Sequence, residues 1–314
     1  THQLWIKDTF DPEGEFDRFF EHDGGSMFIL SGAHTLIGNA LLPLLRDSYQ
    51  TCAIDHNRGS IVDEAFVGAL MDEIRPDVFI NCEELSDPVE CEYRREEAYR
   101  INALAPGMIA RFCKERNITM VQFSSAYVFD GASDRPYTEN ETPRPIQAYG
   151  DSKLLGEQLI QESGCEYLII RISDIYDAKN SPVKKCIESF KKESAFRILR
   201  EIVSPLNSED AARAVFALLK VHAKGTFHCA SREAVPLSDF IRQALGLLKA
   251  QFSHIPDGDI LEINEDYESL FESPRLRALD PGKSSSATGQ PAPGWRQSLE
   301  AFMQAGGCSD LITS

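Results

Sequence analysis

Short apolar runs alternate with helical patterns from residue 27 to residue 172, and this alternation constrains the fold of the chain more than any other feature. The apolar runs lie at residues 27–30, 52–54, 78–80, 119–123 and 167–172. Strands that alternate with helices form βαβ units, in which the strands are parallel and the helices cover both faces of the sheet. The sequence therefore predicts an α/β fold with a doubly wound parallel sheet.

This rhythm divides the 314 residues into three parts. Residues 1–26 form an acidic, aromatic N-terminal extension, and residues 27–178 contain the predicted sheet. After residue 178 the alternation loosens, which predicts a smaller mixed α/β lobe over residues 179–314, with some segments returning to the sheet domain. Ligands of open α/β sheets bind at the carboxyl ends of the strands. We therefore expect the smaller lobe to bind substrate and to close a cleft at that edge.

The charge of the chain excludes several classes of partner. There are 32 basic and 49 acidic residues, a net charge of −17, and an acidic surface repels nucleic acids and anionic lipids. No apolar stretch is long enough to span a bilayer, and the first residues lack the pattern of a signal peptide. The eight cysteines are scattered, without the spacing of a metal site or a disulfide framework. We therefore expect a cytoplasmic protein with reduced thiols and no metal, nucleic-acid or membrane partner.

The first apolar run leads into a glycine turn, SGAHTLIG, at residues 31–38. A strand that runs into such a turn and then into a helix can hold a dinucleotide pyrophosphate at the helix N-terminus, as in a Rossmann-type NAD(P)-binding domain. The candidate contacts are Gly32, Thr35, Leu36, Ile37 and Gly38. Thr35 stands where these turns carry their middle glycine, so it either displaces the cofactor or donates its hydroxyl to a phosphate. A purely structural joint between strand and helix is the alternative.

A carboxylate follows the second apolar run. Asp55 lies 17 residues after Gly38, a position at which an acidic residue can hold a ribose 2′-hydroxyl. A solvated turn residue or helix cap is the alternative for this side chain. Asp55 favours NADH by repelling a 2′-phosphate, whereas the nearby Arg58 would accommodate the phosphate of NADPH, so both cofactors stay open.

Ser125, Tyr149 and Lys153 form the most specific constellation in the sequence. Tyr149 and Lys153 are four residues apart, so on a helix they face the same way. A neighbouring ammonium lowers the pKa of a tyrosine, and the phenol can then exchange a proton with a substrate while hydride moves at the adjacent carbon. A Ser hydroxyl at a strand end can hydrogen-bond the reacting oxygen. A chance Tyr/Lys pair on the surface is the alternative.

Several motifs carry a resemblance to a known family: RPDVFIN (75–81), SSAYVFDG (124–131), RPYTE (135–139), YGDSKLLGE (149–157) and RISDIY (171–176). With these motifs the sequence resembles the extended short-chain dehydrogenase/reductases, specifically the dTDP-4-dehydrorhamnose reductase branch. The resemblance is dense over residues 75–176, diffuse over the rest of 27–250, and absent from 1–26.

The resemblance implies roles for individual residues. Ser125 would polarise the C4 carbonyl of a sugar, Tyr149 would protonate it, and Lys153 would hold the nicotinamide ribose of NADH or NADPH. Tyr127 would border the sugar, and Asn102 would brace the active-site strand. Further cofactor contacts would come from the ends of two strands, at Asn81, Cys82 and Ile172.

Other positions depart from the family pattern. Small residues that follow the third strand and pack on the cofactor are replaced here by Glu83 and Glu84, which would be costly beside a pyrophosphate unless they turn outward. We interpret these carboxylates, with Glu90, as a solvated acidic loop and not as a metal cluster. Near the C-terminus, the family's Arg-Pro segment is reduced to Ser273-Pro274-Arg275.

Three functions remain open after this comparison. The first is an NAD(P)H-dependent reductase that delivers hydride to C4 of a nucleotide-linked 4-keto-6-deoxy sugar, with Tyr149 as the proton donor. The second is a non-catalytic regulatory or binding protein on the same fold, as in the regulatory β subunit of methionine adenosyltransferase, which is similar to this branch. The third is a related reductase or epimerase with another small substrate. Relatives often pair through helices at 95–116 and 146–163, which leaves a homodimer open.

Overall fold

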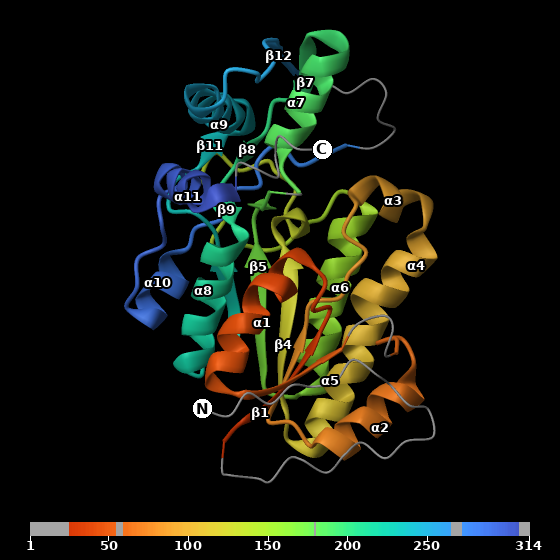
Figure 1. Cartoon of the computed structure of the whole chain (residues 1–314). Helices are drawn as coiled ribbons and strands as arrows, with labels where there is room; N and C mark the ends of the chain where they lie inside the picture. The colour runs from red at the N-terminus through yellow and green to blue at the C-terminus, as the bar shows by residue number, and fades with distance from the viewer. Residues whose placement is uncertain (1–24, 55–58, 179, 265–271, 308–314) are drawn as a thin grey trace.

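Six parallel strands form the central sheet of the protein (Figure 1). The computed structural model describes residues 25–54, 59–178, 180–264 and 272–307. The strand order is β10-β5-β4-β3-β1-β2. The strands are β1 (Met27–Ser31), β2 (Gln50–Ile54), β3 (Val78–Asn81), β4 (Thr119–Ser125), β5 (Tyr167–Ile172) and β10 (Gly225–Cys229). The predicted fold class, a doubly wound parallel sheet, is confirmed.

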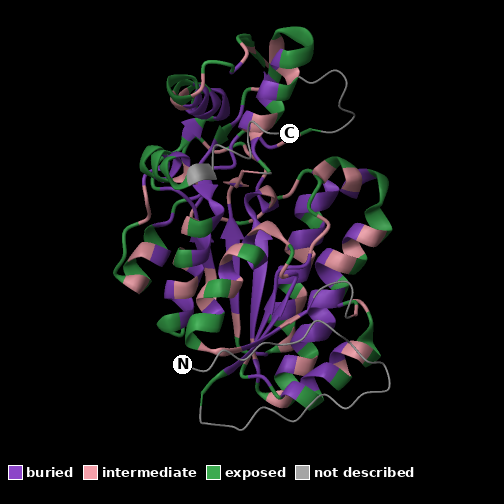
Figure 2. Ribbon diagram, in the orientation of Figure 1, coloured by how far each residue is buried: buried purple, intermediate pink, exposed green. Residues whose placement is uncertain are grey.

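Helices cover both faces of this sheet because successive side chains of each strand are apolar. Helices α1 (Leu36–Ser48) and α8 (Ser208–Lys220) pack on one face, over Leu30, Ile80 and Val121. Helices α2 (Glu64–Ile74), α5 (Ala105–Arg116) and α6 (Ala148–Ser163) pack on the other face, over Ile29, Phe79 and Met120. Figure 2 shows the central strands buried between these two layers. A parallel sheet requires this double cover.

The chain reverses its direction across the sheet next to β1. It passes from β1 outward to β2 and then returns to β3, on the other side of β1. Such a switch point opens a crevice at the carboxyl ends of the strands. Ser31 and Asn81 end β1 and β3 in register, and Ser125 and Ile172 end β4 and β5 in register. The fold therefore brings the predicted site residues to one edge.

Segments after residue 178 build a second lobe and also return to the sheet. The lobe contains α7 (Pro182–Glu193), β7 (Ala195–Leu199), β8 (Ile202–Val203), β11 (Val235–Pro236), α9 (Leu237–Gln251), β12 (Asp259–Ile263) and α11 (Trp295–Phe302). Its core contains Ile187, Phe190, Phe240 and Trp295. Helix α8, strand β10 and helix α10 (Gly282–Thr288) lie against the sheet domain instead, while β6 (Ile175–Tyr176) and β9 (Leu206–Asn207) pair between the two.

The helical region before β4 is divided into segments. Helix α3 (Pro88–Tyr93) is followed by α4 (Arg95–Tyr99), a π-helical turn (Arg100–Leu104) and α5. π-Helical turns are rare and are frequent at functional sites; this one carries Asn102. Among the described residues, no helix is long and apolar enough to cross a membrane.

Candidate active site

The three predicted catalytic residues lie together at the carboxyl edge of β4. Ser125 ends this strand, and Tyr149 and Lys153 lie one turn apart in α6. All three side chains are buried. The Ser125 hydroxyl accepts a hydrogen bond from the Tyr127 N–H (3.3 Å) and is a hydrogen-bond partner of Tyr149. The spacing in the sequence therefore corresponds to one site in the fold.

Two contacts hold the first turn of α6 at this edge. The carboxylate of Glu92 accepts a hydrogen bond from the N–H of Ala148 (2.6 Å), which satisfies a free donor at the start of the helix. Gly150 lies against the carbonyl of Tyr127, and a Cβ added to Gly150 would lie 2.0 Å from that oxygen. The glycine after Tyr149 is thus required by close packing beside the catalytic residues.

Asn102 braces the loop after β3 against α6. Its Oδ1 accepts a hydrogen bond from the N–H of Leu85 (2.9 Å), and its Nδ2 donates to the Leu85 carbonyl (3.0 Å) and to the Ser152 hydroxyl (3.1 Å). The resemblance implied a brace on the active-site strand. The hydrogen bonds instead fix the loop that faces Tyr149 and Lys153.

That loop places a carboxylate against Tyr149 and Lys153. Glu84 Oε2 lies 2.8 Å from Lys153 Nζ and accepts a hydrogen bond from the Tyr149 hydroxyl at 3.2 Å. The Lys153 side chain is 2% exposed and that of Glu84 28%. The expectation of a solvated acidic loop is therefore wrong for Glu84, because a buried ammonium needs a counter-charge and this carboxylate is within reach. It is also wrong for Glu83, which is buried. No local pattern in the sequence predicts the pairing of Glu84 with Lys153, since the two residues are 69 positions apart.

The surroundings of Tyr149 keep its phenol protonated. Burial raises the pKa of Tyr149 well above 10, and the charge of Glu84 acts in the same direction, while the hydrogen bond with Ser125 lowers this pKa. A phenoxide is disfavoured both by desolvation and by a neighbouring negative charge. In the described state Tyr149 can therefore donate a proton but does not readily release one to water.

Tyr127 lies between Tyr149 and a charged cluster of Asp174, Glu201 and Arg277. The centroids of the Tyr127 and Tyr149 rings are 5.3 Å apart, and the Arg277 guanidinium lies 5.0 Å from the centroid of the Tyr127 ring. Arg277 pairs with Asp174 (2.8 Å) and with Glu201 (2.7 Å). Sequence reasoning missed this cluster, although it singled out Ser273-Pro274-Arg275, two residues before Arg277.

A cavity of about 460 Å³ lies beside this cluster. Asp174 is part of its wall, Lys184 and Lys185 come from the first turns of α7, and Leu237 and Phe240 come from α9. The cavity thus combines two cations with an apolar wall, and its lining also includes the carboxylates of Asp174 and Glu188. It lies next to the residues that connect, through Tyr127, to Tyr149.

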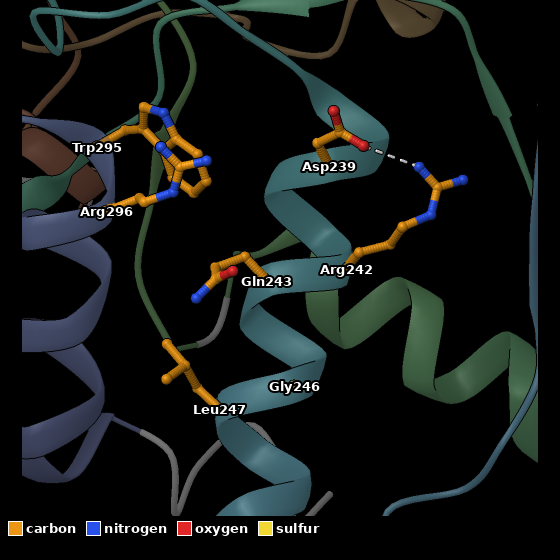
Figure 3. A pocket seen from close by; sticks show the side chains of 7 residues that line it. All are labelled: Asp239, Arg242, Gln243, Gly246, Leu247, Trp295 and Arg296. Carbon is orange, nitrogen blue, oxygen red and sulfur yellow. Dashed lines mark hydrogen bonds and ion pairs between the residues drawn. The ribbon is translucent and has the colours of Figure 1, made fainter.

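A second hollow, of about 400 Å³, lies between α9 and α11 (Figure 3). Arg242 pairs there with Asp239, and the Arg296 guanidinium covers the Trp295 ring at 4.4 Å. It contains none of the residues that the sequence singled out. We therefore place the site at the sheet edge and not in this hollow.

The side chain of Thr35 closes the glycine turn. Thr35 caps α1: its hydroxyl accepts from the Gly38 N–H (3.1 Å) and donates to the Gly32 carbonyl (2.8 Å). Gly32 has φ +73°, and a Cβ on Gly38 would lie 2.1 Å from the Gly32 oxygen, so both glycines are needed for the turn itself. In the described part of the chain, nothing accepts a hydrogen bond from the N–H groups of Leu36 and Ile37.

The remaining predicted cofactor residues have different surroundings. The Asn81 amide is satisfied internally: Oδ1 accepts from the Ser31 hydroxyl (2.8 Å), and Nδ2 donates to Gln122 (2.8 Å). Cys82 is buried, and burial raises the pKa of its thiol. Ile172 is buried at the end of β5. Asp55 lies outside the described residues.

A second buried ion pair lies one turn along α6. Arg171, on β5, donates to Glu157 through Nε (2.9 Å) and Nη2 (2.6 Å), and both side chains are almost fully buried. This two-point contact ties α6 to the sheet. Within the described ranges, no group of three or more His, Cys, Asp or Glu side chains is arranged to hold a metal.

Comparison with known proteins gives a consistent result. The family model for the RmlD substrate binding domain matches residues 27–307. A dTDP-4-keto-6-deoxy-D-glucose reductase of Streptomyces niveus is 30% identical, over 71% of this chain and 79% of that protein. The dTDP-4-dehydrorhamnose reductase of Bacillus anthracis, solved in complex with NADP, has a TM-score of 0.81 at 25% identity, over 90% of this chain and 99% of that one. Methionine adenosyltransferase 2 subunit beta of Mus musculus is 25% identical, over 81% of this chain and 83% of that protein. The chain therefore belongs to the RmlD substrate-binding domain family.

Proposed function

We propose that this protein is an NAD(P)H-dependent reductase of a nucleotide-linked 4-keto-6-deoxy sugar. The observation that carries the proposal is the grouping of Ser125, Tyr149 and Lys153 at the carboxyl edge of β4, with a buried, protonated phenol among them. The names of the relatives in Streptomyces niveus and Bacillus anthracis support this class of reaction.

The glycine turn fits a dinucleotide at its pyrophosphate. The N–H groups of Leu36 and Ile37 point from the start of α1, and the first turn of this helix carries no acidic residue. A helix N-terminus with free donors favours an anion. When bound, the reduced nicotinamide supplies the hydride. The residues proposed to hold the cofactor are Gly32, Thr35, Leu36, Ile37, Gly38, Asp55, Asn81, Cys82, Lys153 and Ile172.

Each catalytic side chain then has a definite task. Tyr149 donates its proton to the C4 carbonyl oxygen, and the Ser125 hydroxyl donates a hydrogen bond to the same oxygen. The ammonium of Lys153 stabilises the phenoxide that the proton transfer leaves behind. Tyr127, whose ring meets that of Tyr149, borders the sugar.

The cavity beside Asp174 is the proposed place for the nucleotide diphosphate. Lys184 and Lys185 would neutralise the phosphates, and Phe240 and Leu237 offer an apolar wall to the base. The Arg277 cluster and Tyr127 connect this cavity with the catalytic residues.

The proposal is tested with dTDP-4-dehydrorhamnose and each nicotinamide cofactor, by following the loss of NADH or NADPH absorbance. Tyr149→Phe removes the donated proton and leaves the ring in place, so we expect turnover to fall by at least about 100-fold with cofactor affinity nearly unchanged. Tyr93→Phe, on the exposed side of α3, is the matched control. Equal loss of turnover and affinity, or full activity in Tyr149→Phe, would remove Tyr149 from this role.

A second candidate function is a non-catalytic, partner-binding protein. The specific observation in its favour is that Glu84 neutralises Lys153, and a regulatory subunit is among the relatives. Tight binding of NADH or NADPH together with turnover of a keto sugar would exclude this candidate.

A further inference from the structure

Glu84 holds both residues that a nicotinamide ribose and a substrate oxygen have to reach. Its Oε2 contacts Lys153 Nζ (2.8 Å) and the Tyr149 hydroxyl (3.2 Å) at the same time. Among the described residues, the ion pair with Glu84 is the one that Lys153 makes. One carboxylate oxygen thus engages the acid–base pair of the proposed reaction.

We propose that Glu84 is a displaceable counter-ion, which holds Lys153 and Tyr149 in a resting state and has to leave Lys153 before a dinucleotide can bind fully. This inference rests on the proposed function, since it assigns the ribose of NADH or NADPH to Lys153. It makes Glu84 a determinant of cofactor affinity and not a catalytic residue.

The two partners differ in their freedom to move. The Lys153 side chain is 2% exposed and comes from the middle of α6, whereas Glu84 is 28% exposed and lies in the loop between β3 and α3. The hydrogen bonds of Asn102 fix this loop at Leu85, one residue after Glu84. The backbone is therefore held, and exchange takes place by rotation of the Glu84 side chain toward water.

The need to replace Glu84 by a ribose at Lys153 lowers the measured affinity for cofactor. A ligand that binds only the open form is weakened by the fraction of molecules in that form. The cost of a buried, unpaired ammonium keeps the open form scarce until ribose hydroxyls arrive as neutral acceptors. In addition, the Glu84 charge opposes the approach of an anionic dinucleotide for as long as it stays in the site.

The test compares NADPH and NADH binding, by nicotinamide fluorescence, in the wild type and in Glu84→Ala, Glu84→Gln and Glu90→Ala. We expect Glu84→Ala to bind at least tenfold more tightly, about 1.4 kcal/mol, and Glu84→Gln to lie between it and the wild type. Glu90→Ala removes the same charge from an exposed position on α3, where Glu90 pairs with Arg94, and should bind as the wild type does. Thermal unfolding of each free variant checks that it folds.

A second readout needs no cofactor. Because Glu84 raises the pKa of Tyr149, its replacement by Gln should lower that pKa in an ultraviolet titration, with Tyr149→Phe as the baseline. An unchanged Tyr149 titration in Glu84→Gln would overturn the coupling that the proposal needs.

The outcomes separate this inference from the proposed function. Cofactor binding that is equal or weaker in Glu84→Ala, with a wild type that binds, overturns the displaceable counter-ion and leaves the reductase proposal in place. Binding in Glu84→Ala and none in the wild type supports it in its strongest form. Absence of binding in every variant up to millimolar cofactor overturns both proposals.

Discussion

Helix α6 carries two buried ion pairs, one turn apart, and they differ in almost every physical respect. Glu157 meets Arg171 through two contacts, with both side chains almost fully buried and the arginine on a central strand. Lys153 meets Glu84 through one contact, with the carboxylate 28% exposed and on a loop. The first pair has partners fixed by regular structure, whereas the second has one partner that can reach water.

The difference separates a charge that fixes the fold from one that a ligand can reach. A pair with both partners buried cannot open without leaving a charge unpaired in the protein interior, so it serves to fix α6 on the sheet. A pair with one partner at the surface can exchange that partner for a ligand. The exposure of Glu84 therefore favours the Lys153 pair as the one that takes part in the proposed reaction.

The largest expected effect comes from breaking the Glu157–Arg171 pair. Glu157→Gln leaves the Arg171 charge buried without a counter-ion, so the free energy of unfolding should fall by about 3–5 kcal/mol. Glu84→Gln should cost less, on the order of 1 kcal/mol, because Lys153 loses one charged contact with a partly exposed carboxylate, whereas Arg171 loses two contacts with a buried one. Urea denaturation of both variants measures the difference. Similar losses in the two variants would contradict the comparison.

A pH titration tests whether water is excluded from the surroundings of Arg171. His228, beside Arg171 in the sheet, is fully buried, and burial, aided by the Arg171 charge, lowers its pKa from 6.5 to about 3. Between these two pH values His228 is therefore protonated in the unfolded chain and neutral in the folded one. Stability should fall as the pH drops from about 6.5 toward 3, by up to about 1.4 kcal/mol per pH unit.

In His228→Asn this part of the slope should disappear, while His254→Asn, at an exposed position, should keep it. Stability is measured by urea denaturation across the pH range. A slope that is the same in wild type and His228→Asn would show that water reaches this part of the sheet.

The smallest effect concerns the uncharged end of the site. Thr35→Ala removes the cap of α1 and should cost about 1 kcal/mol of stability. If the Lys153 end limits cofactor binding, affinity for NADPH or NADH should change far less in this variant than in Glu84→Ala. Fluorescence titration of both decides this. A tenfold change in Thr35→Ala would move the limiting step to the glycine turn.

Local patterns in the sequence were sufficient to predict the fold and the grouping of Ser125, Tyr149 and Lys153. The apolar runs predicted five of the six central strands, and the spacing of Tyr149 and Lys153, with Ser125 at a strand end, predicted their meeting. These inferences need only periodicity and the shared edge of a parallel sheet.

Pairings between distant segments were not predictable in the same way. Glu84 and Lys153 are 69 residues apart, and Asp174 and Arg277 are 103 apart. In the sequence, a loop carboxylate that is solvated and one that pairs with a distant buried cation look the same. For Thr35 the sequence leaves a phosphate contact, a displaced cofactor and a structural joint open, and the structure shows its hydroxyl bonded to Gly32 and Gly38 within the turn.

The Arg277 cluster has a consequence for the history of the chain. Asp174, Glu201 and Arg277 come from three separate segments and are buried or half-buried together under Tyr127. Loss of Arg277 alone leaves two carboxylates without their cation, and loss of either acid leaves Arg277 with one ion-pair partner in place of two. The three positions are therefore expected to be inherited or replaced as a set, and a second lobe transplanted from a relative should function only when all three travel with it.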